Sequence, residues 1–336
     1  AHAEQLLDEK TDELKDNEVS IFLRIGSDLT NNYYEYEVPL KITPRGRYAS
    51  EEGASVWPQE NMIDFPLSLF TKVKQNRNKE SKRENSSVSF LLPYSEYDPE
   101  HIQNKVTIVG NPNLGDVETM MLGVRNNGRS PKSAEIWANE LRLTDYNEKG
   151  GWGAVSDLAI SFSDFGNFNV SGRIETAGFG GIEDNVQSRN LDDRYQVNLS
   201  TAFELGKLFP EKAKVHLPIF FSYSQDYTKP QYNPLDQDVL LDDAIDNLET
   251  EEEKEDLRRN SVTKAVTKSV NLTNVKVDYS GNKPRIYDPA NFSVSYAYNE
   301  TSDLDPETER DFTKQHQGSF IYDFNTTPKP WEPFKN

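Results

Sequence analysis

The sequence predicts an all-β protein made of two β regions that differ in character. Aromatic residues make up 11% of the 336 residues, and 17 Phe and 16 Tyr against 3 Met favour strands over helices. From residue 19 onward, runs in which apolar and polar residues alternate are separated by segments rich in Gly, Pro and Asn. This alternation with turn punctuation is typical of antiparallel strands. The strands become longer and their alternation stricter near residue 150, at the Gly-rich segment 146–153.

The first region, residues 1–147, is predicted to be a jelly-roll-like β-sandwich with a short leading helix in residues 1–18. A polar turn at 27–32 joins two strand-like runs into a hairpin, and the polar, basic stretch 74–87 reads as a mobile loop. Short strands with frequent turns favour a sandwich. The strands expected here cover residues 19–26, 33–40, 105–109, 119–125 and 134–143.

The second region, residues 148–336, has longer strands with stricter alternation. In 194–205, for example, Tyr195, Val197 and Leu199 alternate with Gln196, Asn198 and Ser200. The apolar phase slips near Thr273 and Asn274, as a β-bulge would make it do. The seven strands expected here cover residues 155–163, 166–177, 194–205, 214–224, 268–280, 291–299 and 318–325.

Strand length and connection length together favour a membrane barrel for this region. Strands of about 9 to 13 residues suit a tilted crossing of a bilayer, whereas soluble strands peak at about 5 to 6. Short connections alternate with longer ones at 178–193, 225–267 and 300–313, as in outer-membrane barrels. The longest, 225–267, is expected to contain a helix at 242–259. Residues 148–336 are therefore predicted to be consecutive antiparallel hairpins of a large transmembrane β-barrel; seven strands cannot close alone, because bacterial barrels have even numbers.

The alternation also predicts which side chains face the membrane. Apolar positions would face lipid, and Asn, Ser, Gln and Glu positions would line a wet interior. Aromatic residues at strand ends would lie at the membrane interfaces. The lipid-facing candidates are Val197, Leu199, Phe203, Leu217, Ile219 and Phe221, and the interfacial aromatics are Trp152, Tyr195, Tyr227 and Trp331.

Charge and residue types exclude several functional classes. The net charge of −19 argues against nucleic-acid binding, and no cysteine is present for disulfides or thiolate metal sites. The acidic loop 303–307 starts like a calcium loop, but Thr308 and Lys314 replace the required Gly and Glu. No histidine pair or nucleophile motif appears, so we expect no catalytic, cofactor-binding or metal residue and no enzyme activity; whether the acidic loops bind divalent cations stays open.

Two tryptophans suggest a sugar-binding alternative. The rings of Trp57 and Trp137 could stack on pyranose rings, although Trp137 alternates with Leu141 and Leu143, which favours packing in the core. The chain begins at Ala1 without Met or a signal peptide, so we expect a fragment from which the targeting segment is missing. The acidity is concentrated in residues 1–18, 236–259 and 300–311.

Seven short stretches resemble the SprA (Sov) family of outer-membrane translocons of the type IX secretion system, which is also tied to gliding motility. The resemblance runs from about residue 105 to the end, while the first hundred residues agree only in layout. The stretches are Gly110–Gly115, 134–145 (AEIWANELRLTD), 176–180 (TAGFG), 204–212 (ELGKLFPEK), 229–236 (KPQYNPLD), 291–300 (NFSVSYAYNE) and 328–334 (PKPWEPF).

The resemblance implies a very large barrel at the outer membrane through which folded cargo leaves the periplasm. The implied partners are secreted cargo proteins, other type IX components and outer-membrane lipid. The main alternative is an extracellular carbohydrate-binding or adhesin protein in which both regions are sandwiches. A TonB-dependent receptor segment would also have long outer loops, but it requires a plug domain, for which the sequence has no feature.

Overall fold

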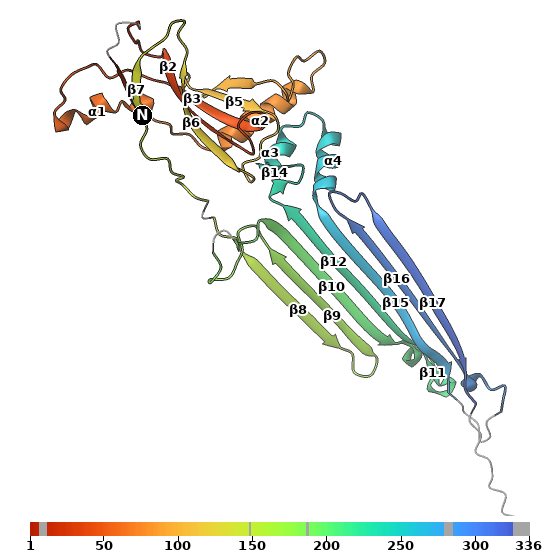
Figure 1. The fold of residues 1–336 in the computed structure, drawn as a ribbon. Helices are drawn as coiled ribbons and strands as arrows, with labels where there is room; N and C mark the ends of the chain where they lie inside the picture. The colour runs from red at the N-terminus through yellow and green to blue at the C-terminus, as the bar shows by residue number, and fades with distance from the viewer. Residues whose placement is uncertain (7–11, 148, 186–187, 279–284, 325–336) are drawn as a thin grey trace, which may run out of the picture. The chain divides into compact units, whose positions relative to one another are not determined.

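The chain folds into two compact units, in a computed structural model that describes residues 1–6, 12–147, 149–185, 188–278 and 285–324 (Figure 1). Unit 1 comprises residues 1–147 together with 232–249, and unit 2 comprises 148–231 together with 250–336. The chain therefore passes between the units three times. Every strand pair in the described ranges is antiparallel, in agreement with the all-β class predicted from the sequence.

Unit 1 is built on a five-stranded sheet in the order β4-β5-β3-β2-β6. Its strands are β2 Val19–Gly26, β3 Tyr33–Pro39, β4 Tyr94–Tyr97, β5 Lys105–Val109 and β6 Thr119–Asn126. Two small sheets accompany it, one of β1 His2–Gln5 with β7 Ala134–Trp137, and one of β13 Tyr232–Asn233 with β14 Asp236–Leu240. The short helices are η1 Ser50–Glu52, α1 Gly53–Val56, η2 Gln59–Asn61 and α3 Leu241–Asp246.

The core of unit 1 lies between this sheet and helix α2, Ser68–Ser81. Leu69, Phe70 and Val73 of α2 are buried, and the Phe70 ring stacks on Tyr34 of β3 with centroids 4.9 Å apart. The prediction of a mobile loop at 74–87 is therefore wrong through residue 81. One large sheet of the predicted sandwich is present. Helix α2 covers its apolar face, where a second large sheet was expected.

The first residues also differ from the prediction of a leading helix. Residues 2–5 form strand β1, whose residues pair with β7 from His2–Trp137 to Gln5–Ala134. Ala3 is fully buried in the core, which a solvated helix would not have allowed. Residues 7–11 lie outside the described ranges.

Unit 2 is an up-and-down sheet in which each long strand pairs with its neighbour in sequence, in the order β17-β16-β15-β12-β10-β9-β8. The short strand β11 also pairs with β15. Within the described residues the sheet is open, with β8 and β17 as its edges. The strands are β8 Gly153–Ser161, β9 Gly166–Glu175, β10 Asp192–Glu204, β11 Val215–His216, β12 Pro218–Pro230, β15 Thr263–Val277, β16 Phe292–Leu304 and β17 Asp311–Tyr322.

The predicted β-bulge is confirmed in β15. The register against β16 shifts between Leu272 and Val275, and Asn274 takes the left-handed conformation with φ 54°. The extra residue keeps Val275 opposite Val294, so apolar side chains continue on one face of the sheet beyond the shift.

The connections fall into two sets, one at each end of the strands. At the end that we call the loop end they span 176–191, 231–262 and 305–310, and at the turn end they span 162–165, 205–217 and 278–291. The 3-10 turns η4 Leu205–Leu208, η5 Glu211–Ala213 and η6 Pro289–Asn291 lie in the turn-end set. The predicted long loop at 300–313 is wrong, because β16 extends to Leu304 and β17 begins at Asp311.

The helix predicted at 242–259 is interrupted. Helix α3 ends at Asp246 in unit 1, and α4, Glu251–Ser261, begins in unit 2 after Thr250 caps it. The Thr250 hydroxyl accepts from the Glu253 amide at 3.2 Å, and the Glu253 carboxylate accepts from the Thr250 amide at 3.3 Å. This reciprocal pair is a capping box, which fixes the start of α4. In the described residues, no helix combines the length and apolar character needed to cross a membrane.

Candidate functional site: the two faces of the unit 2 sheet

The register of unit 2 sorts its side chains onto two faces of different chemistry. Opposed residues of an antiparallel pair point to the same face, and successive residues alternate. We call one side the apolar face and the other the polar face. One row of opposed residues on the apolar face is Ile160, Phe168, Thr201, Phe221, Val270, Tyr298 and His316, in which His316 of β17 is the one titratable side chain besides Tyr298. The neighbouring row on the polar face is Ala159, Asn169, Ser200, Ser222, Ser269, Asn299 and Gln315.

Five of the six lipid-facing candidates lie on the apolar face: Val197, Leu199 and Phe203 of β10, with Ile219 and Phe221 of β12. That they face lipid stays a prediction. The sixth, Leu217, precedes β12, where its amide donates to Glu204 at 2.7 Å and its carbonyl accepts from Leu205.

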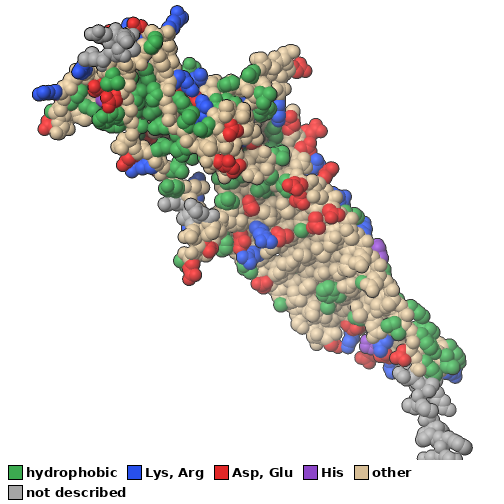
Figure 2. All heavy atoms as spheres, viewed as in Figure 1, with side chains coloured by type: hydrophobic (Ala, Val, Ile, Leu, Met, Phe, Trp, Pro, Cys, Tyr) green, Lys and Arg blue, Asp and Glu red, His purple; other side chains and the backbone are tan. Residues whose placement is uncertain are grey.

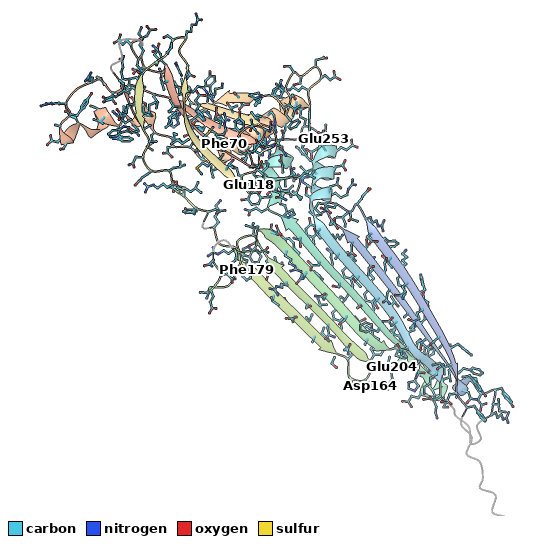
Figure 3. All side chains as sticks on the ribbon, in the orientation of Figure 1. Phe70, Glu118, Asp164, Phe179, Glu204 and Glu253 are labelled. Atoms are coloured by element: carbon cyan, nitrogen blue, oxygen red, sulfur yellow. The ribbon has the colours of Figure 1, made fainter. Side chains whose placement is uncertain are left out.

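The interfacial aromatics are found at the loop end where the structure describes them. Tyr195 and Tyr227 are opposed on the apolar face, with ring centroids 6.0 Å apart. Trp152 directly precedes β8 and is exposed. Trp331 lies outside the described residues. Figure 3 shows the two ends, with Phe179 at the loop end and Asp164 and Glu204 at the turn end.

The polar face carries small uncharged side chains along its middle. Figure 2 shows a side of the sheet on which such side chains and backbone predominate. Towards the loop end, Arg194 pairs with Asp226 at 2.7 Å, Gln196 donates to the same carboxylate at 2.7 Å, and Arg173 pairs with Glu175. Asp157 lies in the middle of β8 on the same face, and Glu204 lies at the turn end. Between these charges the surface consists mainly of hydroxyl and amide groups, which bind water well.

A buried ionic cluster in unit 1 holds the inserted segment 232–249. Lys74 of α2, 1% exposed, contacts Asp236 at 2.6 Å and Asp238 at 2.9 Å, and its ammonium also donates to the Pro112 carbonyl at 2.8 Å. Asp238 further accepts from the Tyr34 hydroxyl at 2.6 Å. We call Lys74, Asp236, Asp238 and Tyr34 the Lys74 cluster.

Burial sets the electrostatics of this cluster. It raises the pKa of the Tyr34 hydroxyl, and the neighbouring Asp238 carboxylate raises it further. Arg77, one turn along α2 from Lys74, donates to the Gly110 carbonyl and lies over the Phe90 ring at 4.2 Å, and burial lowers its pKa.

Two of the stretches that carried the family resemblance meet at this cluster. Gly110–Gly115 supplies the Pro112 carbonyl and the Leu114 amide, which donates to Asp238 at 3.1 Å, and 229–236 supplies Asp236. Gly110 has φ 71°, and a Cβ there would lie 1.9 Å from the Asn31 carbonyl oxygen. The sequence analysis missed this cluster because its partners are far apart in the chain. A helical spacing of Lys74 and Arg77 directly after Leu69, Phe70 and Val73 could have indicated that both basic side chains lie on the buried side of a helix.

The two tryptophans with sugar-binding potential come together around one histidine. The His2 ring lies 6.0 Å from Trp57 and 5.7 Å from Trp137, centroid to centroid. Trp137 is 56% exposed, and its indole donates to Glu135 at 2.6 Å. The prediction that Trp137 packs in the core is therefore wrong: it lies on the two-stranded sheet β1–β7, opposite His2, and more than half of its surface is exposed.

The acidic segments have internal partners. The Asp305 carboxylate accepts from the amides of Glu307 and Thr308, both at 2.8 Å, which accounts for the calcium-like start of this loop. Glu300 lies in β16 and pairs with Lys268 at 3.1 Å. In the part of the chain that the structure describes, no group of three His, Asp or Glu side chains is arranged to hold a metal ion.

An open antiparallel sheet with one apolar and one polar face, together with a second unit built on a five-stranded sheet, places the chain among two-unit all-β proteins. A family model described as motility related/secretion protein, SprA_N, matches residues 1–245. The chain belongs to this family. Among curated proteins, none matches the chain.

Proposed function

We propose that unit 2 forms part of the wall of an outer-membrane protein-conducting barrel of the type IX secretion and gliding machinery, and that unit 1 is its accessory domain. The observation that carries the proposal is the register-aligned separation of apolar and polar faces over seven consecutive long strands. Soluble single-layer sheets of this length would expose both faces to water, and the apolar one would then need a cover.

The dimensions support a membrane crossing. Strand β10 has 13 residues. At about 3.3 Å per residue and a tilt of about 45°, such a strand spans roughly 30 Å along the membrane normal, close to the thickness of a hydrocarbon core. The Tyr195–Tyr227 pair would then lie at headgroup level, where aromatic side chains are favoured.

Conduction in this proposal is passive. The polar face would line the channel, and its Ser, Asn and Gln side chains would keep the wall hydrated while folded cargo passes. We propose secreted cargo proteins and other secretion components as partners, with outer-membrane lipid around the barrel and no enzymatic step. Further strands beyond the seven would be needed to close the wall.

A pair of neighbouring lysine substitutions tests the proposal in the full-length protein. Leu199 opposes Val170 and Tyr223 in the middle of the apolar face, while Ser200 opposes Asn169 and Ser222 on the polar face. Leu199→Lys should cost about 2 to 4 kcal/mol at mid-bilayer, whereas Ser200→Lys should cost little.

The measurement is the fraction of protein that assembles in the outer membrane, together with export of a cargo protein. Leu199→Lys should lower both, and Ser200→Lys should lower neither by more than a small amount. Equal behaviour of the two variants would contradict a wall with one lipid-facing and one water-facing side, because the two adjacent positions lie on opposite faces of the sheet.

A second candidate function rests on the Trp57–His2–Trp137 group. Exposed tryptophan rings suit stacking on sugar rings, so unit 1 could bind a glycan at the cell surface. The form of this alternative in which both regions are sandwiches is disfavoured, since the described part of unit 2 has a single layer. Glycan-array binding by the full-length protein that survives Trp57→Ala and Trp137→Ala would exclude it.

A further inference from the structure

Basic side chains gather at the loop end of the apolar face. The register places Lys264 and Lys268 of β15 and Lys314 of β17 on this face, together with Glu300 of β16. Lys268, Glu300 and Lys314 are successive opposed partners across the three strands, in the register row that also contains Tyr223 and Leu199. Lys314 is the fourth residue of β17 from the loop end and Glu300 the fifth of β16, whereas Leu199 is the eighth of β10, so the row approaches the loop end towards β17. Another opposed pair, Asp193 and Lys229, lies near the same end. Towards the turn end, the described strand residues of the apolar face carry no Lys, Arg, Asp or Glu.

These side chains line an open groove of about 460 Å³ that lies within unit 2. The charged residues that line it are Arg259, Lys264, Lys268, Glu300, Glu309 and Arg310. Arg259 pairs with Asp256 at 2.8 Å, which leaves Lys264, Lys268 and Arg310 against Glu300 and Glu309, and Lys314 adds a further cation next to the groove.

The carboxylates do not neutralise the groove. Glu300 serves two lysines at once, with its oxygens 3.1 Å from the Lys268 ammonium and 4.0 Å from that of Lys314. It also accepts from the Tyr298 hydroxyl at 2.5 Å. Lys264 has no ion-pair partner among the described residues. The groove thus retains positive charge for a ligand that is not part of the chain.

An aromatic ring holds two of the cations at the rim. The Arg310 guanidinium carbon and the Lys314 ammonium each lie 4.7 Å from the centre of the Phe312 ring, which is 38% exposed. Phe312 itself is on the apolar face, opposite Ser302. Cations stacked on an exposed aromatic ring, directly above an apolar surface, match a ligand that is anionic at one end and apolar at the other.

We propose that this groove binds the phosphate groups of an anionic membrane lipid, whose acyl chains lie along Val270, Leu272 and Tyr298. The inference rests on the proposed function, because it requires the apolar face to contact lipid. Lysine is tolerated on a lipid face only near the interface, and the loop end is where that interface would lie. A soluble phosphate compound would not need the adjoining apolar surface, so the lipid is the better match.

The test measures lipid retention by the whole protein in a neutral detergent. Phosphatidylglycerol, phosphatidylcholine or inorganic phosphate is added, and bound lipid is counted by native mass spectrometry. The double variant Lys264→Gln/Lys314→Gln should retain phosphatidylglycerol about 10- to 30-fold more weakly, because each lysine near a membrane surface contributes about three- to fivefold. Lys264→Arg/Lys314→Arg should retain it as the natural protein does.

The matched control is Lys276→Gln. Lys276 lies on the polar face at the turn end, opposite His216 and 3.3 Å from Asp278, and its loss should leave retention unchanged. Equal loss in this control, or no loss in the double variant, would overturn the proposal. Displacement of the lipid by inorganic phosphate would also overturn it, in favour of a soluble anion site.

The two proposals fail in different ways. If the natural protein inserts into phosphatidylcholine vesicles but has no preference for phosphatidylglycerol, the groove assignment fails and the barrel wall stands. If the protein enters neither phosphatidylcholine vesicles nor those containing phosphatidylglycerol, both proposals fail.

Discussion

Removal of the Asp238 carboxylate should release the inserted segment 232–249 from unit 1. Asp238 accepts from Lys74 at 2.9 Å, Tyr34 at 2.6 Å and the Leu114 amide at 3.1 Å, and its side chain is 1% exposed. Asp238→Ala therefore leaves three buried donors without this acceptor. Only Lys74 retains a carboxylate partner, Asp236, and that carboxylate is 17% exposed.

The magnitude follows from what the substitution leaves behind. Breaking a buried ion pair by deleting one partner typically costs about 3 to 5 kcal/mol, because the remaining charge stays desolvated. We expect Asp238→Ala to cost this amount in unit 1. Lys74→Met should cost less in the Asp238→Ala background than in the natural protein, because the lysine has then lost its most buried partner.

Hydrogen exchange of the α2 amides is the assay. If the free energy of opening falls by about 3 kcal/mol, amides that exchange only through that opening should exchange roughly a hundredfold faster. The control is Glu249→Ala in the same segment, since the Lys79–Glu249 contact is 3.4 Å long between side chains 42% and 71% exposed and should contribute little. Equal exchange in Asp238→Ala and Glu249→Ala would refute the argument that the buried cluster holds the segment.

Three further predictions concern single features. Hydrogen bonds from the Asn31 and Thr30 amides and from the Asn32 side chain lower the pKa of Asp28 from 3.8 to about 2. Because the pKa is lower in the folded than in the unfolded protein, the ionised Asp28 stabilises the fold fully above the ordinary pKa. This contribution to folding stability disappears as the pH falls from about 4 through about 2. An NMR titration of Asp28 should show this, and acid unfolding of Asp28→Asn should lack that part of the pH dependence. Gly110→Ala should destabilise unit 1 by more than about 2 kcal/mol in urea unfolding, through left-handed strain and the clash with Asn31, whereas Gly53→Ala, with open space around its Cβ, should be nearly neutral. Thr250→Ala should lower the free energy of hydrogen-exchange protection in the first turn of α4 by about 1 kcal/mol. An unchanged exchange rate of those amides would contradict the role of Thr250 as the cap.

The strands of unit 2 could be predicted from the sequence because each carries its own evidence. Alternation in β10 assigns Leu199 and Ser200 to opposite faces without knowledge of any neighbour, and the phase slip at Asn274 marks the bulge in the same way. The ends of β16 and β17 were harder. Alternation places Glu300 on the apolar face, where Lys268 and Lys314 of the neighbouring strands pair with its carboxylate, and a single strand does not reveal those partners.

Unit 1 was predicted less well because its decisive contacts are non-local. Lys74 and Arg77 made residues 74–87 look like a solvated loop, since basic side chains are rarely buried without partners. The partners of Lys74 are Asp236 and Asp238, and the second of these is 164 residues away along the chain. Without them, α2 would bury an unpaired ammonium group, so its structure cannot be inferred from its own sequence.

The insertion of 232–249 also sets an order of events during biogenesis. Unit 1 cannot neutralise Lys74 until Asp236 and Asp238 have been synthesised, and strands β8 to β12 of unit 2 precede both of them in the chain. The N-terminal part of unit 1 therefore has to wait, incompletely packed, for a segment from within the later hairpins. Unit 1 is therefore complete only after the chain has returned from the unit 2 hairpins through residues 232–249, so the folding of the first unit depends on the synthesis of the second.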